Sequence, residues 1–338
     1  MPELSTVWFV LLLFLFGGYA LLDGFDLGAG AVHLYVARTD EERRHVLNAI
    51  GPVWDGNEVW LITGGGALFA AFPIVYATVF SGFYLAMALV LGALILRGIS
   101  IEFRGKETAI WWRRAWDFGF FLGSALAALL FGVALGNLLN GLALDHGVYR
   151  GGLVGLLNPF SLGVGVLTLA LAVQQGSAWL VLKTEGDLAA RARRAQIAAQ
   201  IAVVAAWVGV TALAWADNSR IFDNFKVNLA AWVGPVLAAN AVFFGLRATL
   251  LRQAFRAFLC SSLTIATMAV TAATALYPNL VPAVDRAQSL TVNNAHSSDL
   301  ALQVMLVVAL VGMPIVLAYT AFIYWKFKGK VRLEKASY

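Results

Sequence analysis

The chain has 338 residues, of which 60% are hydrophobic and only 13% are charged, and its mean hydropathy is +0.77. Soluble domains use about 45–50% apolar and about 25% charged residues, so this composition excludes a soluble globular protein. The net charge of +5 is explained by basic loops beside anionic lipid, and no nucleic-acid partner is expected.

Nine apolar segments, most of them close to the roughly 20 residues that cross a bilayer core, follow one another along the chain. They are Val7–Leu22 (extended towards Ala37), Ala49–Phe72, Ile74–Leu96, Phe118–Leu139, Ser161–Leu182, Ile197–Trp215, Leu229–Leu246, Ala257–Leu276 and Leu300–Trp325. No linker separates them, which predicts one all-α integral membrane domain over residues 1–338. Glu3 and the absence of a positive leader indicate a retained first helix.

Positive charge alternates between the loops of this nine-helix arrangement. Of the 24 Lys and Arg residues, 20 fall in one alternate set of loops and four in the other. Because cytoplasmic loops accumulate Lys and Arg during insertion, the pattern predicts an N-terminus outside the cytoplasm and a C-terminus inside it.

Two carboxylate pairs interrupt the apolar segments. Asp23 and Asp26 follow the first apolar run, about 24 Å from its outer end, and Asp55 and Glu58 lie in the second. Each pair has i, i+3 spacing, which places both carboxyl groups on one helix face. Charged groups at membrane depth are costly and mark proton relays, so these four residues are the candidate site.

Structural roles remain open for the same residues. Asp23 and Asp26 are also suited to capping a helix or pairing with Arg97 or Arg104. The small-residue segment 63–67 suits close packing against another helix or a flat group. Asp117, beside Arg113 and Arg114, is expected to form an interfacial ion pair.

Metal ligands are poorly placed for a redox centre. His146 and His296 lie in predicted outer loops, His45 lies in an inner loop, and His33 at a helix end is expected to be an interfacial polar residue. The single Cys260 excludes an internal disulfide and a thiolate-ligated cluster. The chain is therefore expected to bind no metal or haem by itself.

Two motifs carry a family resemblance. GYALLDGFDLG at 18–28 and GPVWDGNEVWLI at 51–62, continued by TGGGALFAAFP at 63–73, resemble subunit II of the cytochrome bd quinol oxidases, including the cyanide-insensitive branch. Weaker similarity at GNLL (136–139), LNPF (157–160) and YWK (324–326) extends it over the whole chain.

The resemblance implies two four-helix bundles plus a peripheral helix, here residues 1–140, 141–277 and 278–338. It implies a respiratory subunit in the bacterial cytoplasmic (inner) membrane, paired with a subunit I that carries haems b and d, and leaves room for a small single-helix subunit. The complex would oxidise quinol and reduce O₂ to water with cytoplasmic protons. This chain would stabilise subunit I and lend proton-uptake carboxylates, at Asp55 and at Asp23 and Asp26, with Glu58 where some relatives have Gln.

Two other functional classes stay open on the residues alone. A proton-coupled secondary transporter also places carboxylates at helix breaks inside the membrane, but it works without a haem partner. A purely structural membrane scaffold would tolerate neutralisation of Asp55. Co-purification of a haem-containing chain distinguishes the oxidase from the transporter.

Overall fold

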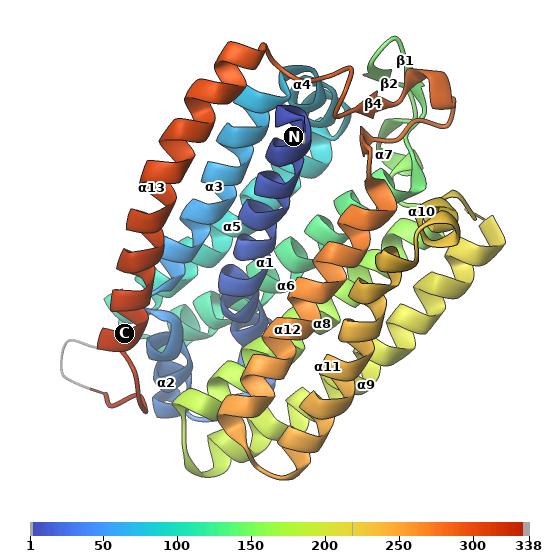
Figure 1. Cartoon of the computed structure of the whole chain (residues 1–338). Helices are drawn as coiled ribbons and strands as arrows, with labels where there is room; N and C mark the ends of the chain where they lie inside the picture. The colour runs from blue at the N-terminus through green and yellow to red at the C-terminus, as the bar shows by residue number, and fades with distance from the viewer. Residues whose placement is uncertain (1–2, 218, 334–338) are drawn as a thin grey trace.

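The computed structural model describes residues 3–217 and 219–333, most of which lie in helices (Figure 1). Within these ranges eight helices are long and apolar enough to cross a membrane. They are built on α1 (Leu4–Val36), α5 (Tyr84–Phe103), α6 (Ile110–Asn140), α8 (Pro159–Lys183), α9 (Gly186–Asp217), α11 (Val233–Leu250), α12 (Ala254–Leu276) and α13 (Asp299–Lys326). The prediction of an all-α integral membrane protein is confirmed at this level.

The second predicted run forms α3 (Trp54–Ala71), which is not among these eight spans. It has 18 residues, and its two carboxylates and several glycines lower its mean hydropathy. A nine-helix count and the in-out orientation therefore stay predictions.

Short elements connect the long helices. The helical ones are α2 (Asp40–Ile50), α4 (Pro73–Gly82), α7 (Gly152–Gly155), α10 (Asp223–Val227), η1 (Arg104–Lys106), η2 (Ser219–Phe222), η3 (Leu229–Trp232) and η4 (Arg286–Gln288). The antiparallel strand pairs are β1 (Leu144–Asp145) with β2 (Val148–Tyr149), and β3 (Asn279–Val281) with β4 (Leu290–Thr291). Both hairpins lie in the predicted outer loops, and a bridge between Leu142 and Ala283 joins the two loops.

Two of the predicted apolar runs do not form continuous helices, so the prediction is wrong in this respect. Ala49 belongs to the end of α2, and the chain turns at 51–53 before α3, because Pro52 has no N–H with which to continue a helix. The run Ile74–Leu96 is divided at Phe83 between α4 and α5. The β1–β2 hairpin packs closely against this break, since a Cβ at Gly82 would lie 2.8 Å from the Tyr149 Cβ.

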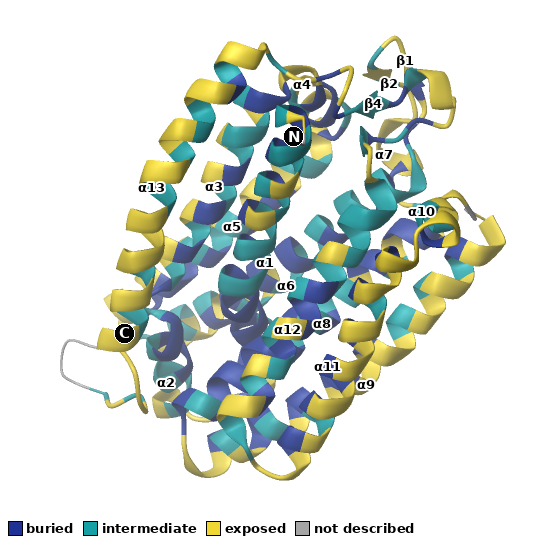
Figure 2. Ribbon diagram, viewed as in Figure 1, coloured by how far each residue is buried: buried dark blue, intermediate teal, exposed yellow. Residues whose placement is uncertain are grey.

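Helix α1 is the centre of the bundle and packs against α3, α6, α8 and α12 (Figures 1 and 2). Its contact with α8 is backbone to backbone. A Cβ at Gly28 would lie 1.7 Å from the Ala172 carbonyl oxygen, and one at Gly176 would lie 2.2 Å from the Ala29 nitrogen. Helices α6 and α8 also pack together across the predicted boundary at 140/141, and the division into two bundles stays a prediction.

Helix α13 lies along the edge of the bundle beside α3, and most of its surface is exposed (Figure 2). The segment that follows it returns to the end of α8. Lys183 Nζ donates to the Phe327 carbonyl at 2.5 Å, Lys330 Nζ donates to the Thr184 carbonyl at 2.7 Å, and the Val331 N–H donates to the Lys183 carbonyl at 2.9 Å. These bonds satisfy helix-end carbonyls and tie the peripheral helix to the rest of the chain.

Gly28→Ala is expected to lower the stability of the folded chain by about 1–3 kcal/mol, because the added methyl group would overlap the α8 backbone. Thermal unfolding of the purified protein measures the loss. Gly17→Ala is the matched control in the same helix, since nothing lies within 4 Å of a Cβ there, and it should unfold no earlier than the parent. Equal melting of the two variants would contradict the close approach of α1 and α8.

Candidate functional site

A buried polar cluster lies where α1, α3, α5 and α13 meet. Asp23 and Asp26, one turn apart on α1, are both fully buried. Asp23 contacts a basic side chain, and Asp26 contacts a neutral one. The sequence correctly placed both carboxyl groups away from water, and the structure supplies their neighbours.

Arg97 of α5 is the cation of this cluster and is itself fully buried. Its Nη2 donates to Asp23 Oδ1 at 2.6 Å and its Nη1 to Asp23 Oδ2 at 2.9 Å, a bidentate pair of the geometry that guanidinium and carboxylate groups favour. The same Nη1 lies 3.1 Å from Glu58 Oε1, and the guanidinium lies 5.8 Å from the centre of the Trp54 ring. Of the two pairings open for Asp23, the Arg97 pair is the one that forms.

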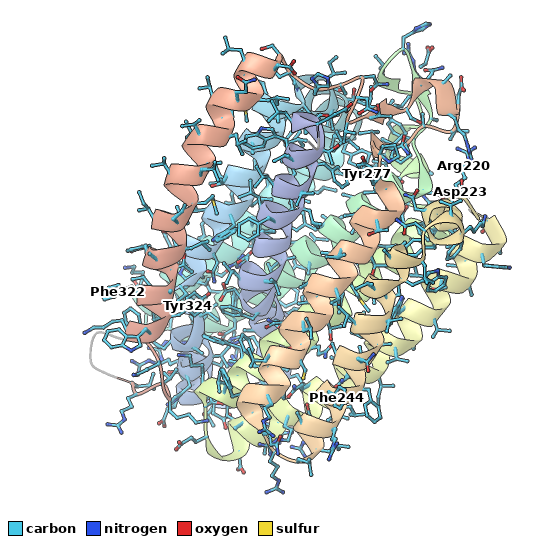
Figure 3. The ribbon with its side chains drawn as sticks, in the orientation of Figure 1. Arg220, Asp223, Phe244, Tyr277, Phe322 and Tyr324 are labelled. Atoms are coloured by element: carbon cyan, nitrogen blue, oxygen red, sulfur yellow. The ribbon has the colours of Figure 1, made fainter. Side chains whose placement is uncertain are left out.

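Asp26 is held by neutral groups. Asn57 Nδ2 donates to Asp26 Oδ2 at 2.7 Å, and the Tyr324 hydroxyl of α13 donates to Asn57 Oδ1 at 3.0 Å (Figure 3 labels Tyr324). The second oxygen of Asp26 and the Tyr19 hydroxyl are buried without a hydrogen-bond partner in the described part of the chain. An unpaired buried carboxyl oxygen is a place where a proton or a water molecule can be held.

The two carboxylates of α3 have different surroundings. The Glu58 side chain is 26% exposed and reaches inward to Arg97. Asp55 is exposed and makes no hydrogen bond or ion pair with the residues that the structure describes. Asp55 and Glu58 lie one helix turn apart on α3, but only Glu58 reaches Arg97 of α5.

Sequence reasoning missed three members of the cluster as site residues. Arg97 lies just past an apolar run, and the sequence predicts it only as a pairing partner of the α1 carboxylates. Asn57 lies between the two α3 carboxylates, and Tyr324 lies in the last apolar run. A polar side chain inside an otherwise apolar segment was the available signal for the last two.

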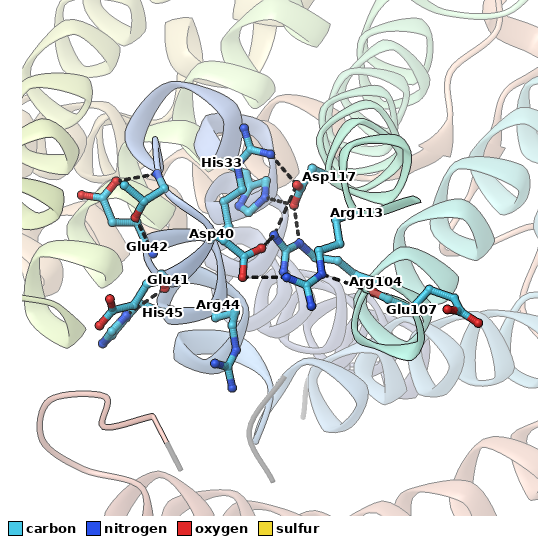
Figure 4. Close-up of polar contacts among 12 residues, drawn as sticks. His33, Asp40, Glu41, Glu42, Arg44, His45, Arg104, Glu107, Arg113 and Asp117 are labelled. Atoms are coloured by element: carbon cyan, nitrogen blue, oxygen red, sulfur yellow. Dashed lines mark hydrogen bonds and ion pairs between the residues drawn. The ribbon is translucent and has the colours of Figure 1, made fainter. Parts of the chain in front are cut away.

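A second charged cluster lies at the end of the bundle that carries α2 (Figure 4). Asp117 is fully buried and accepts from His33 Nε2 at 2.8 Å, Arg43 Nη1 at 2.5 Å and Arg104 Nε at 2.6 Å. The expected interfacial pair of Asp117 with Arg113 or Arg114 is wrong, because Arg113 is directed to Asp40. His33 is likewise buried, and not interfacial as expected, since α6 covers that face of α1.

No group of three or more His, Cys, Asp or Glu side chains within the described ranges is arranged to hold a metal ion. His33 uses one ring nitrogen on Asp117, and His45 uses one on the Glu41 carbonyl. The buried cluster is a set of carboxyl, amide and hydroxyl groups around the guanidinium of Arg97.

Glu42 joins α2 to α9 outside the membrane-spanning segments. It completes a capping box with Thr39 and forms an ion pair with Arg191, whose Nε also donates to the Val36 carbonyl at 2.6 Å. Burial raises the pKa of Glu42, but hydrogen bonds from the Arg38 N–H and from Arg191 outweigh it, so the pKa lies below its ordinary value.

The comparisons with known proteins agree over nearly the whole chain. The family model described as "Cytochrome bd terminal oxidase subunit II" matches residues 4–327. The chain is 39% identical to "Cytochrome bd-I ubiquinol oxidase subunit 2" of Escherichia coli, with 98% of this chain and 96% of the relative covered. It is 35% identical to "Cytochrome bd ubiquinol oxidase subunit 2" of Bacillus subtilis, with 98% of both covered.

A solved structure has the same fold. The bd oxidase from Geobacillus thermodenitrificans includes a chain that matches with a TM-score of 0.74, covering 96% of this chain and 98% of that one at 15% identity. This likeness concerns the fold alone.

The Glu42 pair should make stability fall in acid. A carboxyl group with a depressed folded-state pKa stabilises the fold fully above its ordinary pKa, and that contribution is lost as the pH falls through the folded value. Thermal unfolding from about pH 7 to about pH 3 measures this loss. Glu42→Gln should lower the melting temperature at neutral pH and flatten the acid dependence, whereas the exposed neighbour variant Glu41→Gln should leave both unchanged. Identical pH profiles for Glu42→Gln and the parent would contradict this assignment.

Proposed function

Because this chain belongs to the cytochrome bd terminal oxidase subunit II family, we propose that it supports the haem-bearing subunit and lends carboxylates to proton uptake. Membership makes it a subunit of a quinol:O₂ oxidoreductase and a multi-pass membrane protein, in bacteria of the inner membrane. The haems and the quinol reaction belong, in this proposal, to a partner subunit I. A small single-helix subunit is a further proposed partner.

The observation that carries the proposal is the charge balance of the buried cluster. Asp23, Asp26 and Glu58 supply three carboxyl groups around the single guanidinium of Arg97. Burying uncompensated charge is costly, so the cluster is neutral only when it holds protons in addition to Arg97. Reduction of O₂ to water consumes protons at a buried site, and a group of carboxyls with this excess can supply them.

The carboxyl groups also form a sequence from the surface inward. Asp55 is exposed, Glu58 one turn further along α3 is partly exposed, and Asp23 and Asp26 are fully buried. Arg97 lies between Glu58 and Asp23 and contacts both. We infer a route in which Asp55 receives a proton, Glu58 passes it inward, and Arg97 holds the inner carboxyl in place.

The exposed face of α3 is the proposed contact with subunit I. A carboxylate such as Asp55 facing hydrocarbon is unfavourable, whereas a protein partner offers polar groups or water. Open space surrounds the Cβ positions of Gly65 and Gly66 on this helix, while Gly64 already packs against Phe16. Two small residues on a free face let a neighbouring helix approach closely.

The other two functional classes lose support. The relatives reported above are oxidase subunits, and none of them favours a proton-coupled transporter. A purely structural role accounts for the Arg97–Asp23 pair. It does not explain why Asp26 Oδ1 is buried without a hydrogen-bond partner among the described residues, or why the Asp55 carboxylate is exposed.

Asp55→Asn and Glu58→Gln remove a titratable proton while keeping side-chain size. In the proposed route each assembled complex keeps its haem content, steady-state O₂ consumption falls about tenfold or more, and single-turnover proton uptake slows. Asp187→Asn is the control, since Asp187 is an exposed carboxylate at the start of α9.

The double variant Asp55→Asn with Asp23→Asn removes the outermost and one of the innermost carboxyl groups of the proposed route together. Normal proton uptake by that fully assembled double variant would refute the relay role. Loss of haem with normal turnover per haem would instead show that these carboxyl groups serve assembly.

Gly65→Leu tests the contact face. A leucine there fills the open space beside α3, so less haem-bearing partner should co-purify, and the haem content per mole of this chain should drop severalfold. Gly92→Leu on α5 is the control, because its Cβ position is also open. Equal haem content in the two variants would place the partner elsewhere.

A further inference from the structure

A groove between the end of α11 and the start of α12 has the composition of a ligand site. It encloses about 370 Å³ and has no acidic residue in its lining. Arg247 and Arg256 supply the charge, and Phe244, Leu251 and Leu259 supply most of the apolar surface. We propose that this groove binds the phosphate headgroup and upper acyl chains of an anionic phospholipid.

The two guanidinium groups are held near each other by a short turn. Only residues 251–253 join the helices, and Arg252 has a left-handed backbone with φ of 57° that reverses the chain. The Gln253 N–H donates to the Ala248 carbonyl at 2.9 Å and fixes the turn. Deeper in the membrane a Cβ at Gly245 would lie 3.2 Å from the Cys260 Cβ, so the helices are in close contact below the groove.

The guanidinium groups have free donors. Arg256 Nη1 donates to Gln253 Oε1 at 3.0 Å, which orients the group and leaves its other N–H groups available. Arg247 makes no side-chain hydrogen bond or ion pair with any residue that the structure describes. Two arginines with unused donors and no carboxylate beside them favour a phosphate, whose oxygens accept such bonds.

The charged groups of the groove lie at the helix ends and the apolar groups lie deeper, which is the order of headgroup and acyl chain in an amphiphile. Phe244 lies one turn deeper in α11 than Arg247, and Leu259 lies one turn deeper in α12 than Arg256. Both apolar side chains are about half exposed, at 50% and 48%. Figure 3 shows Phe244 near the end of α11.

The position of the groove along the membrane-spanning helices favours a lipid as the ligand. The arginines lie at the ends of two membrane-spanning helices, on the side where most Lys and Arg residues of the chain gather. Basic pockets between helices at this level recognise anionic headgroups. A free phosphate would use the arginines but leave the two apolar side chains uncovered.

The test uses the assembled oxidase complex and native mass spectrometry, with phosphatidylglycerol and phosphatidylethanolamine supplied in equal amounts. The parent complex should retain phosphatidylglycerol selectively. R247Q/R256Q should weaken that retention roughly thirtyfold, since each basic residue contributes about 1 kcal/mol of attraction. R193Q/R194Q makes the same charge change at the start of α9, outside the groove lining, and should retain the lipid like the parent.

Three results would overturn the assignment. One is equal retention in R247Q/R256Q and the parent, and another is equal loss in R193Q/R194Q. The third is displacement of phosphatidylglycerol by inorganic phosphate alone, which would show an anion site without a lipid. If R247Q/R256Q does not assemble, Arg247→Gln and Arg256→Gln alone should each weaken retention about fivefold, and R247K/R256K should keep most of it.

Discussion

The bidentate pair between Arg97 and Asp23 is the constraint on which the centre of this structure depends. A guanidinium group buried among membrane helices needs a polar partner, and Asp23 is that partner, so this pair holds the side chains of α1 and α5 together at this level. Small residues bring the flanking helices close to both partners. A Cβ at Gly123 of α6 would lie 2.6 Å from the Ala93 carbonyl of α5, and a Cβ at Gly28 of α1 would lie 1.7 Å from the Ala172 carbonyl of α8.

The remaining polar groups at the centre fix the peripheral helix. Asn57 connects Asp26 on α1 to Tyr324 on α13, and the segment after α13 bonds to the end of α8 through Lys183 and Lys330. Most of α13 is otherwise exposed. Trp8 Nε1 also donates to the Leu302 carbonyl near the start of α13 at 3.0 Å, so polar contacts hold the helix at both ends, and the contact through Asn57 belongs to the proposed proton site.

The two buried charge clusters differ in sign. Asp117 is surrounded by His33, Arg43 and Arg104, so its negative charge is fully compensated and it joins α1, α2, η1 and α6. Around Arg97 the carboxyl groups outnumber the cation. The first arrangement stabilises a fixed structure, whereas the second changes its charge whenever a proton enters, which is why only the second is assigned a part in turnover.

Composition and local pattern were sufficient for the membrane class and for the family, because hydropathy and short motifs are properties of contiguous residues. The neighbours of those residues were decided by the tertiary structure. Arg97 is 74 positions from Asp23, and spacing along one helix does not say which helix covers a given face. For the same reason the sequence does not show which of Asp55 and Glu58 reaches Arg97, and it suggests the adjacent Arg113 and Arg114 as partners of Asp117. Only the placement of α5 beside α3 shows that Glu58 reaches Arg97 while Asp55 faces outward. Only the placement of α2 beside α6 buries Asp117 among cations that are distant in the sequence.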